Sequence, residues 1–307
     1  MKATTKKSPN AIADAAAATQ AKAAVANNPN VGRVDPSRAG GGTDVAVAAG
    51  TSVGFALDFA ADAGLGLENA DKDSFAIPFL AILQSNSPQC LPVEEGGIEG
   101  ARMGMLINSV TKELMKEARV VPVYFQRRYL AWALRTAGGG FKGEHSVADI
   151  ESGRQPSALK EVNLGNGPVQ LLMTPEGYML KDTRIHYVLI VRDDGSWMPA
   201  MMSLSSTQIK RSKAWLSRIQ NIIMKDVNGK SFNPPSFSHI YKLHCVREEN
   251  DKGSWYSLDI DVDGPVADAE LYAAARSFHS QVASGKVESA APIDTDGVGS
   301  ADRGGQF

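Results

Sequence analysis

The chain has 307 residues, of which 43% are apolar and 21% charged, and its formal net charge at pH 7 is −2. This composition is typical of a globular protein and excludes a collagen-like or wholly disordered chain. The longest apolar runs fall far short of the roughly 20 residues that cross a bilayer, and the N-terminus lacks the apolar core of a signal peptide. We therefore expect a protein that neither spans a membrane nor is secreted.

The residues of enzyme and metal sites are scarce or badly spaced. Cys90 and Cys245 are the only cysteines, and none of the five histidines lies in a C-x-x-C or H-E-x-x-H pattern. Gly138–Gly143 matches G-x-G-x-x-G, but the residues that follow are broken by Gly and Pro and do not predict the helix that a dinucleotide site requires. The sequence therefore predicts a protein that is not an enzyme and has no cofactor or metal.

Three regions follow from changes in composition along the chain. Met1–Ser74 contains 20 alanines and 8 glycines and has few large apolar side chains to offset chain entropy. We predict a disordered Ala/Gly-rich arm over residues 1–72, a folded body over 73–285 and a flexible C-terminal tail over 286–307.

Strand signals dominate the first half of the predicted body. Runs rich in Val, Ile, Leu and Tyr are separated by Gly, Pro, Asn and Asp, which is the pattern of short antiparallel strands. The predicted strands are Met103–Asn108, Arg119–Gln126, Tyr129–Leu134, Val169–Thr174 and Ile185–Arg192. Near the end of the body, His239–Arg247 and Trp255–Val262 alternate apolar and polar residues around a run of turn formers and predict a hairpin.

Two helices are predicted beside these strands. Thr207–Met224 follows two candidate caps, Ser205 and Ser206, and Pro265–Ser284 starts at a proline and stops at Gly285. The apolar stripe of the first helix is Ile209, Trp215, Leu216, Ile219, Ile222 and Ile223, and that of the second is Leu271, Ala275, Phe278 and Val282.

The order of strands, helix, hairpin and second helix predicts a mainly β (α+β) fold. It matches an OB-like, partly open β-barrel with an inserted amphipathic helix and a C-terminal helix, flanked by disordered tails. A plain α+β sandwich built from the same elements is the alternative.

The small net charge hides two basic blocks. Arg119–Lys142 contains five basic residues and no acidic one, and Lys210–Arg247 contains eight basic residues and only Asp226. Because local patches rather than net charge govern binding to polyanions, the chain is compatible with a nucleic-acid partner.

Aromatic residues are interleaved with these cations. Proteins that bind single strands need this mixture, because cations follow the phosphates while flat rings stack on bases of any sequence. The predicted nucleic-acid-binding residues are Tyr124, Arg127, Arg128, Tyr129, Trp132, Arg135, Phe141, Lys142, Lys210, Arg211, Lys213 and Arg218. The alternative interpretation is that Tyr124 and Trp132 are core residues and that the charged side chains only form a solvated face.

Several of these segments resemble a known family. The sequences of Phe75–Pro88, Met105–Glu113, Val120–Tyr129, Gly138–Phe141, Ser205–Trp215 and Asn250–Trp255 resemble a family of tailed-phage proteins described as single-stranded DNA-binding proteins. The resemblance covers about Phe75–Ser284. It implies a phage origin, action in the cytoplasm of the infected bacterial host and a role in DNA replication or recombination.

The end of the chain is similar to the tails of replicative single-stranded DNA-binding proteins, in which sparse acids precede a terminal Phe. This similarity implies that Phe307 anchors phage replication proteins. The predicted function is sequence-tolerant binding of single-stranded DNA. The alternatives are a strand-annealing protein of the recombinase type and a virion or host-takeover protein that binds protein and not DNA.

Overall fold

The computed structural model describes residues 65–69, 77–163, 167–251, 253–285 and 287. Most of the predicted arm, and the predicted tail with Phe307, lie outside these residues. Leu65–Asn69 is an exposed turn. The chain divides after Phe75, and every helix and strand below belongs to the unit that begins at Ala76.

The fold is mainly β, as predicted, and its principal sheet is antiparallel. Pairing runs in the order β13-β12-β4-β8-β7-β6, with β5 added to β4 and β9 to β8. The strands are β4 (Glu117–Trp132), β5 (Phe141–Ser146), β6 (Ala158–Asn163), β7 (Pro168–Met173), β8 (Met179–Val191), β9 (Trp197–Ser205), β12 (His239–Asn250) and β13 (Gly253–Pro265). Within the described residues this pairing order does not close into a barrel, and the OB-like arrangement stays a prediction.

Smaller elements complete the unit. β1 (Leu80–Ile82), β2 (Leu106–Asn108) and β3 (Leu114–Met115) form a three-stranded sheet, and β10 (Met224–Lys225) pairs with β11 (Ser231–Phe232). The helices are α2 (Val147–Glu151), α3 (Ile209–Gln220) and α4 (Ala269–Ala283), with short 3-10 turns that include η5 (Arg135–Ala137), η6 (Ser206–Gln208) and η7 (Ser236–Ser238). None of the helices in the described part of the chain is long and apolar enough to cross a membrane.

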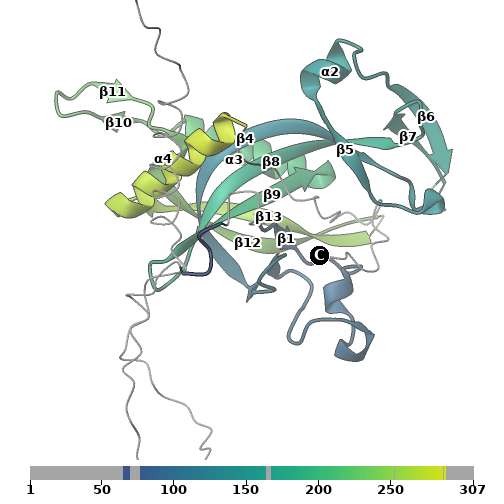
Figure 1. The fold of residues 1–307 in the computed structure, drawn as a ribbon, viewed down its shortest axis with the longest axis horizontal. Helices are drawn as coiled ribbons and strands as arrows, with labels where there is room; N and C mark the ends of the chain where they lie inside the picture. The colour runs from purple at the N-terminus through teal and green to yellow at the C-terminus, as the bar shows by residue number, and fades with distance from the viewer. Residues whose placement is uncertain (1–64, 70–76, 164–166, 252, 286, 288–307) are drawn as a thin grey trace, which may run out of the picture. The chain divides into compact units, whose positions relative to one another are not determined.

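Each face of the principal sheet is covered by a helix. Neighbouring residues of a strand point to opposite faces, so each strand contributes side chains to both helix contacts. On one face, Val121 and Leu189 pack with the buried stripe of α4, which is Leu271, Ala275, Phe278 and Val282 as predicted. On the other face, Val120 and Val188 pack with Trp215 of α3. Figure 1 shows β4 and β8 arching above the β12–β13 hairpin.

The predicted terminal hairpin is confirmed. β12 and β13 pair antiparallel with Leu243 opposite Ile260 and Cys245 opposite Leu258, so the apolar residues share one face.

Two element predictions were wrong. The strands predicted on either side of Arg127 form one strand of 16 residues, because β8 pairs with β4 from Arg119 to Trp132 and supports the charged stretch. Pro265 ends β13 and does not begin a helix. α4 starts after Asp268, whose carboxylate accepts hydrogen bonds from the backbone N–H groups of Glu270 and Leu271.

The first predicted helix is shorter than expected. Ser206 has a positive φ of 51°, and η6 precedes α3 with Ser205 as its N-cap residue, whose side chain makes no cap hydrogen bond. At the other end, Ile223 is exposed and Met224 belongs to β10, so neither extends the apolar stripe.

Candidate nucleic-acid interface

Strand alternation separates the predicted residues of β4. Tyr124, Arg128 and Trp132 point to the face covered by α4, whereas Arg127 and Tyr129 point to the opposite face. The cluster that is continuous in sequence is therefore divided between two surfaces in space.

Two of the predicted aromatic residues belong to the core. Trp132 is 4% exposed and packs edge-on against Phe141, with ring centroids 5.6 Å apart. Tyr124 is half-buried between Tyr187 and His279 of α4, at 6.2 and 5.5 Å. The Trp132 ring is enclosed by side chains, which agrees with the core interpretation, and its part in nucleic-acid binding stays a prediction.

The arginines of β4 are paired with acids. Asp182 accepts hydrogen bonds from Nε and Nη2 of Arg127 at 3.1 and 2.9 Å, and this contact raises the pKa of Arg127. The Arg127 guanidinium also lies 5.6 Å from the ring centroid of Tyr129. Arg128 lies 3.8 Å from Glu144. The charge of this predicted block is thus largely compensated within the protein.

Lys142 differs from these arginines. Its side chain is exposed, its ammonium lies 5.9 Å from the ring centroid of Tyr178, and no described carboxylate forms an ion pair with it. Phe141 beside it is half-buried. Arg135 lies in η5, and its side chain is not among those that the structure describes. The start of β5 and the β7–β8 turn therefore bring together a cation without a described ion pair and the Tyr178 ring.

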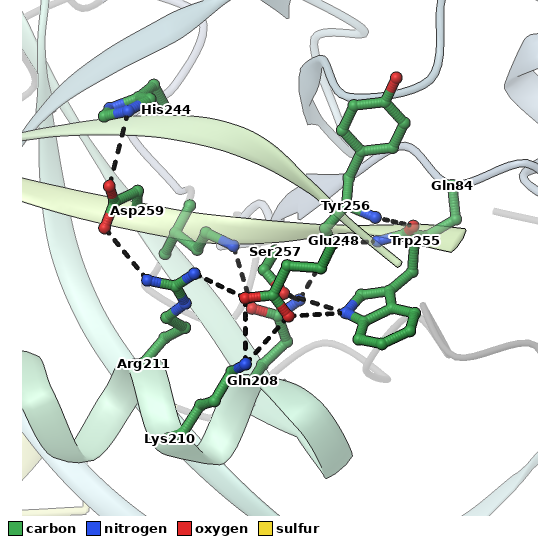
Figure 2. Close-up of polar contacts among 11 residues, drawn as sticks. Gln84, Gln208, Lys210, Arg211, His244, Glu248, Trp255, Tyr256, Ser257 and Asp259 are labelled. Atoms are coloured by element: carbon green, nitrogen blue, oxygen red, sulfur yellow. Dashed lines mark hydrogen bonds and ion pairs between the residues drawn. The ribbon is translucent and has the colours of Figure 1, made fainter. Parts of the chain in front are cut away.

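The cations of α3 are held mainly by the β12–β13 hairpin, as Figure 2 shows for the first two. Glu248 accepts hydrogen bonds from Lys210 Nζ at 3.0 Å and from Arg211 Nη2 at 2.6 Å. Arg211 also donates to Asp259 at 3.3 Å, and Arg218 lies 3.8 Å from Asp261. These contacts form a clamp, defined here as Lys210, Arg211, Glu248, Trp255 and Asp259.

The electrostatics of the clamp centre on Glu248. Burial alone would raise its pKa, but the hydrogen bonds from Lys210, Arg211 and Ser257 outweigh burial and lower the pKa to about 2. Trp255 Nε1 donates to the same carboxylate at 3.1 Å. Of the four cations predicted on this helix, Lys213 is the one without an ion pair to any described residue. Its side chain is exposed.

Amide contacts fasten the clamp to the rest of the fold (Figure 2). Gln208 donates to the carbonyl of Tyr256 at 3.0 Å and accepts from the N–H of Leu258 at 3.0 Å. Gln84 makes the corresponding pair of bonds to Tyr256, at 2.8 and 2.9 Å. The Gln208 contacts hold the start of α3 against β13, and the Gln84 contacts hold the segment after β1 against the same strand.

One group near the clamp has residue types that bind metals. Ligand atoms of His244, Asp259 and Asp261 lie within 4.8 Å of one another. However, Nε2 of His244 faces Asp259 at 3.8 Å while Nδ1 faces Asp261 at 3.9 Å, and Arg211 and Arg218 lie beside the two carboxylates. The three residues therefore alternate with arginines in a row of polar contacts, and their ligand atoms do not all point to one position.

The sequence interpretation did not include Tyr178 or the β10–β11 hairpin. Tyr178 reaches Lys142 only through tertiary folding, so no local signal marks it. The hairpin does have a signal, since Asn228-Gly229 between Met224 and Phe232 is a typical hairpin turn.

These features define a mainly antiparallel β protein with a helix on each face of its sheet, in which acidic side chains of the described residues hold Arg127, Arg128, Arg211 and Arg218. The family model described as "Pam3 phage gp34-like protein" matches residues 48–288, which is more than half of the chain. The chain therefore belongs to the Pam3 phage gp34-like protein family, and the predicted phage origin is confirmed. A search of the curated proteins found no match, and a search of the solved structures found none.

Proposed function

We propose that the protein binds single-stranded DNA without sequence preference and acts in phage DNA replication or recombination in the cytoplasm of the bacterial host. The observation that carries this proposal is the exposed Lys142 ammonium over the Tyr178 ring, with Phe141 beside it. A cation without an internal partner next to flat rings suits a phosphate and its base.

The proposal includes an OB-like barrel as the scaffold. Two features support it: the strands β4 and β8 arch over the β12–β13 hairpin (Figure 1), and α3 lies in the chain between β9 and β12. OB-folds likewise carry a helix between strands and bind oligonucleotides across a strand face.

A salt-dependent titration with labelled oligonucleotides tests the proposal. We expect preference for single-stranded over double-stranded DNA, and a fall in affinity with salt. If Lys142 and three other unpaired cations each neutralise one phosphate, the log–log slope is about −3, at roughly 0.7 per contact. Lys142→Ala is expected to weaken binding, whereas Lys116→Ala, another exposed lysine without an ion pair in the described chain but without a ring beside it, changes it little.

One observation favours a second candidate, a phage protein that binds other proteins. Ion pairs neutralise most arginines of the two basic blocks, which lowers the attraction for a polyanion. Absence of any oligonucleotide affinity at low salt would select this candidate. Acceleration of strand annealing in the same samples would instead identify a protein of the annealing type.

A further inference from the structure

The β10–β11 hairpin exposes large apolar side chains. Figure 1 shows it projecting from the body beyond α4. We call residues Ile223–Asn233 the finger. Its exposed fractions are 66% for Ile223, 39% for Met224, 101% for Val227 and 43% for Phe232. None of these four side chains belongs to a core cluster of the described residues, so packing in the core does not explain their type.

The finger is held in a defined conformation. The Asp226 carboxylate accepts hydrogen bonds from the backbone N–H groups of Asn228 and Lys230, both at 2.9 Å, and Gly229 adopts the positive φ of 78° that the turn requires. At its base, the Asn233 side chain donates to the carbonyls of Gln220 and Ile222, at 2.7 and 3.2 Å. A segment ordered in advance loses less entropy when it binds a partner.

Charge indicates which partner the finger fits. Lys225 and Lys230 form no ion pair with any described residue, and Asp226 is the single acid between them. Met224 lies directly opposite Phe232 in the pairing register and Lys225 lies opposite Ser231, so the two lysines and the ring belong to one short hairpin, with Lys225 on the other face from the ring. A hairpin that carries both an exposed ring and cations without an ion pair is complementary to a base and its neighbouring phosphates.

We propose that the finger is a second contact for single-stranded nucleic acid, in which Phe232 stacks on a base and Lys225 and Lys230 bind phosphates. This inference rests on the proposed function. It adds a binding element that lies apart from β5, the strand that carries Lys142 (Figure 1).

The test uses the full chain and fluorescently labelled oligothymidylates at several salt concentrations. Phe232→Ala is expected to weaken binding roughly five- to 150-fold, the effect of losing one stacked base. Phe232→Trp keeps a ring, so it should retain the affinity of the parent protein, and the added indole emission should be quenched by the oligonucleotide. The double variant Lys225→Gln/Lys230→Gln should lower the log–log salt slope by about 1.4.

Val227→Ala is the matched control, because it removes exposed apolar surface from the tip without touching a ring or a charge. Its affinity should stay within about twofold of the parent. Equal losses for Val227→Ala and Phe232→Ala would overturn the stacking contact and indicate apolar docking. A change in oligomeric state in Phe232→Ala, with DNA affinity intact, would overturn the proposal in favour of a second copy of the chain.

The pattern of DNA affinities among these variants separates this inference from the proposed function. If Lys142→Ala weakens binding and the finger variants do not, only the finger proposal fails. If the parent protein binds no oligonucleotide, both fail.

Discussion

The cations of α3 and those of the finger differ in what the fold places beside them. Lys210 and Arg211 share the carboxylate of Glu248, whereas Lys225 and Lys230 have no acid partner among the described residues. Both sets come from one basic block of the sequence. The comparison teaches that a basic block in the sequence gives only the number of cations. Which of these cations can bind a polyanion depends on which of them the tertiary contacts leave without an ion pair.

The same contrast holds for aromatic residues. Trp132 lies in the most basic stretch of β4 but is buried against Phe141, whereas Phe232 lies in a short hairpin and is 43% exposed. Proximity to arginines in sequence does not predict which ring meets solvent. Burial and pairing together separate residues that stabilise the fold from residues free to bind.

The largest expected effect follows from truncating the buried ring. Trp132→Ala removes a side chain that is 4% exposed, and the cavity should lower the free energy of unfolding by about 3–5 kcal/mol. Phe232→Ala is the comparison and should change stability by less than about 0.5 kcal/mol. Urea unfolding followed by circular dichroism measures both. Equal stabilities would mean that Trp132 is not a core residue.

Breaking the clamp should have the next largest effect. Hydrogen bonds from Lys210, Arg211 and Ser257 lower the pKa of Glu248 to about 2, and because solvent screens these partly exposed pairs, Glu248→Gln should lower the free energy of unfolding by about 2 kcal/mol at pH 7. Glu249→Gln is the matched control, because the neighbouring Glu249 is exposed and contacts only Arg247 among the described ion pairs. A loss for Glu249→Gln as large as that for Glu248→Gln would contradict the role of the clamp.

The clamp also has a predictable pH dependence. Because the pKa of Glu248 is lower in the folded state, its contribution is complete above about pH 4.5 and is lost as the pH falls from about 4.5 to about 2. The stability difference between the parent protein and Glu248→Gln should therefore shrink across that window. A difference that stays constant down to pH 2 would show that Glu248 acts through packing and not through charge.

Removing the carboxylate that pairs with Arg127 on β4 should turn a cation with a structural role into one that can bind DNA. Asp182 holds Arg127 through two hydrogen bonds and Arg184 through one at 3.3 Å. Asp182→Asn should lower stability by about 2 kcal/mol, because it leaves the buried Arg184 without a full counter-charge. It should also raise affinity for single-stranded DNA severalfold by freeing Arg127. Asp193→Asn, at an exposed turn, is the control and should change neither quantity.

Local patterns were sufficient to predict the β12–β13 hairpin and the buried stripe of α4. Both depend on periodicities of two and 3.6 residues, which the sequence displays directly. The pairing of charges was not predictable in this way. Arg211 bonds Glu248 and Asp259, which lie 37 and 48 residues further along the chain and outside the basic block Lys210–Arg247.

Element boundaries failed where tertiary contacts override local signals. The two arginines in the middle of β4 look like a break between strands, yet they are accommodated because Asp182 and Glu144 lie beside them on β8 and β5. A proline after a glycine is typical of a helix start, which is why the sequence predicts one at Pro265. In the structure β13 continues through Gly264 and Pro265, because they pair with Ile240 and His239 of β12. For the interface, the sequence predicted the required residue types but not which copies of each type stay exposed.

The smallest expected effect compares two cations on one helix. Arg211 binds two carboxylates, so Arg211→Gln should lower the free energy of unfolding by about 1–2 kcal/mol and leave the salt dependence of DNA binding unchanged. Lys213 is exposed, so Lys213→Gln should change stability by less than about 0.5 kcal/mol. If Lys213 contacts one phosphate, the same variant should reduce the log–log salt slope by about 0.7. The two variants remove the same charge from positions two residues apart, so electrostatics at long range cannot distinguish them. Identical salt slopes for both would mean that net charge, and not the unpaired state of a particular cation, governs binding.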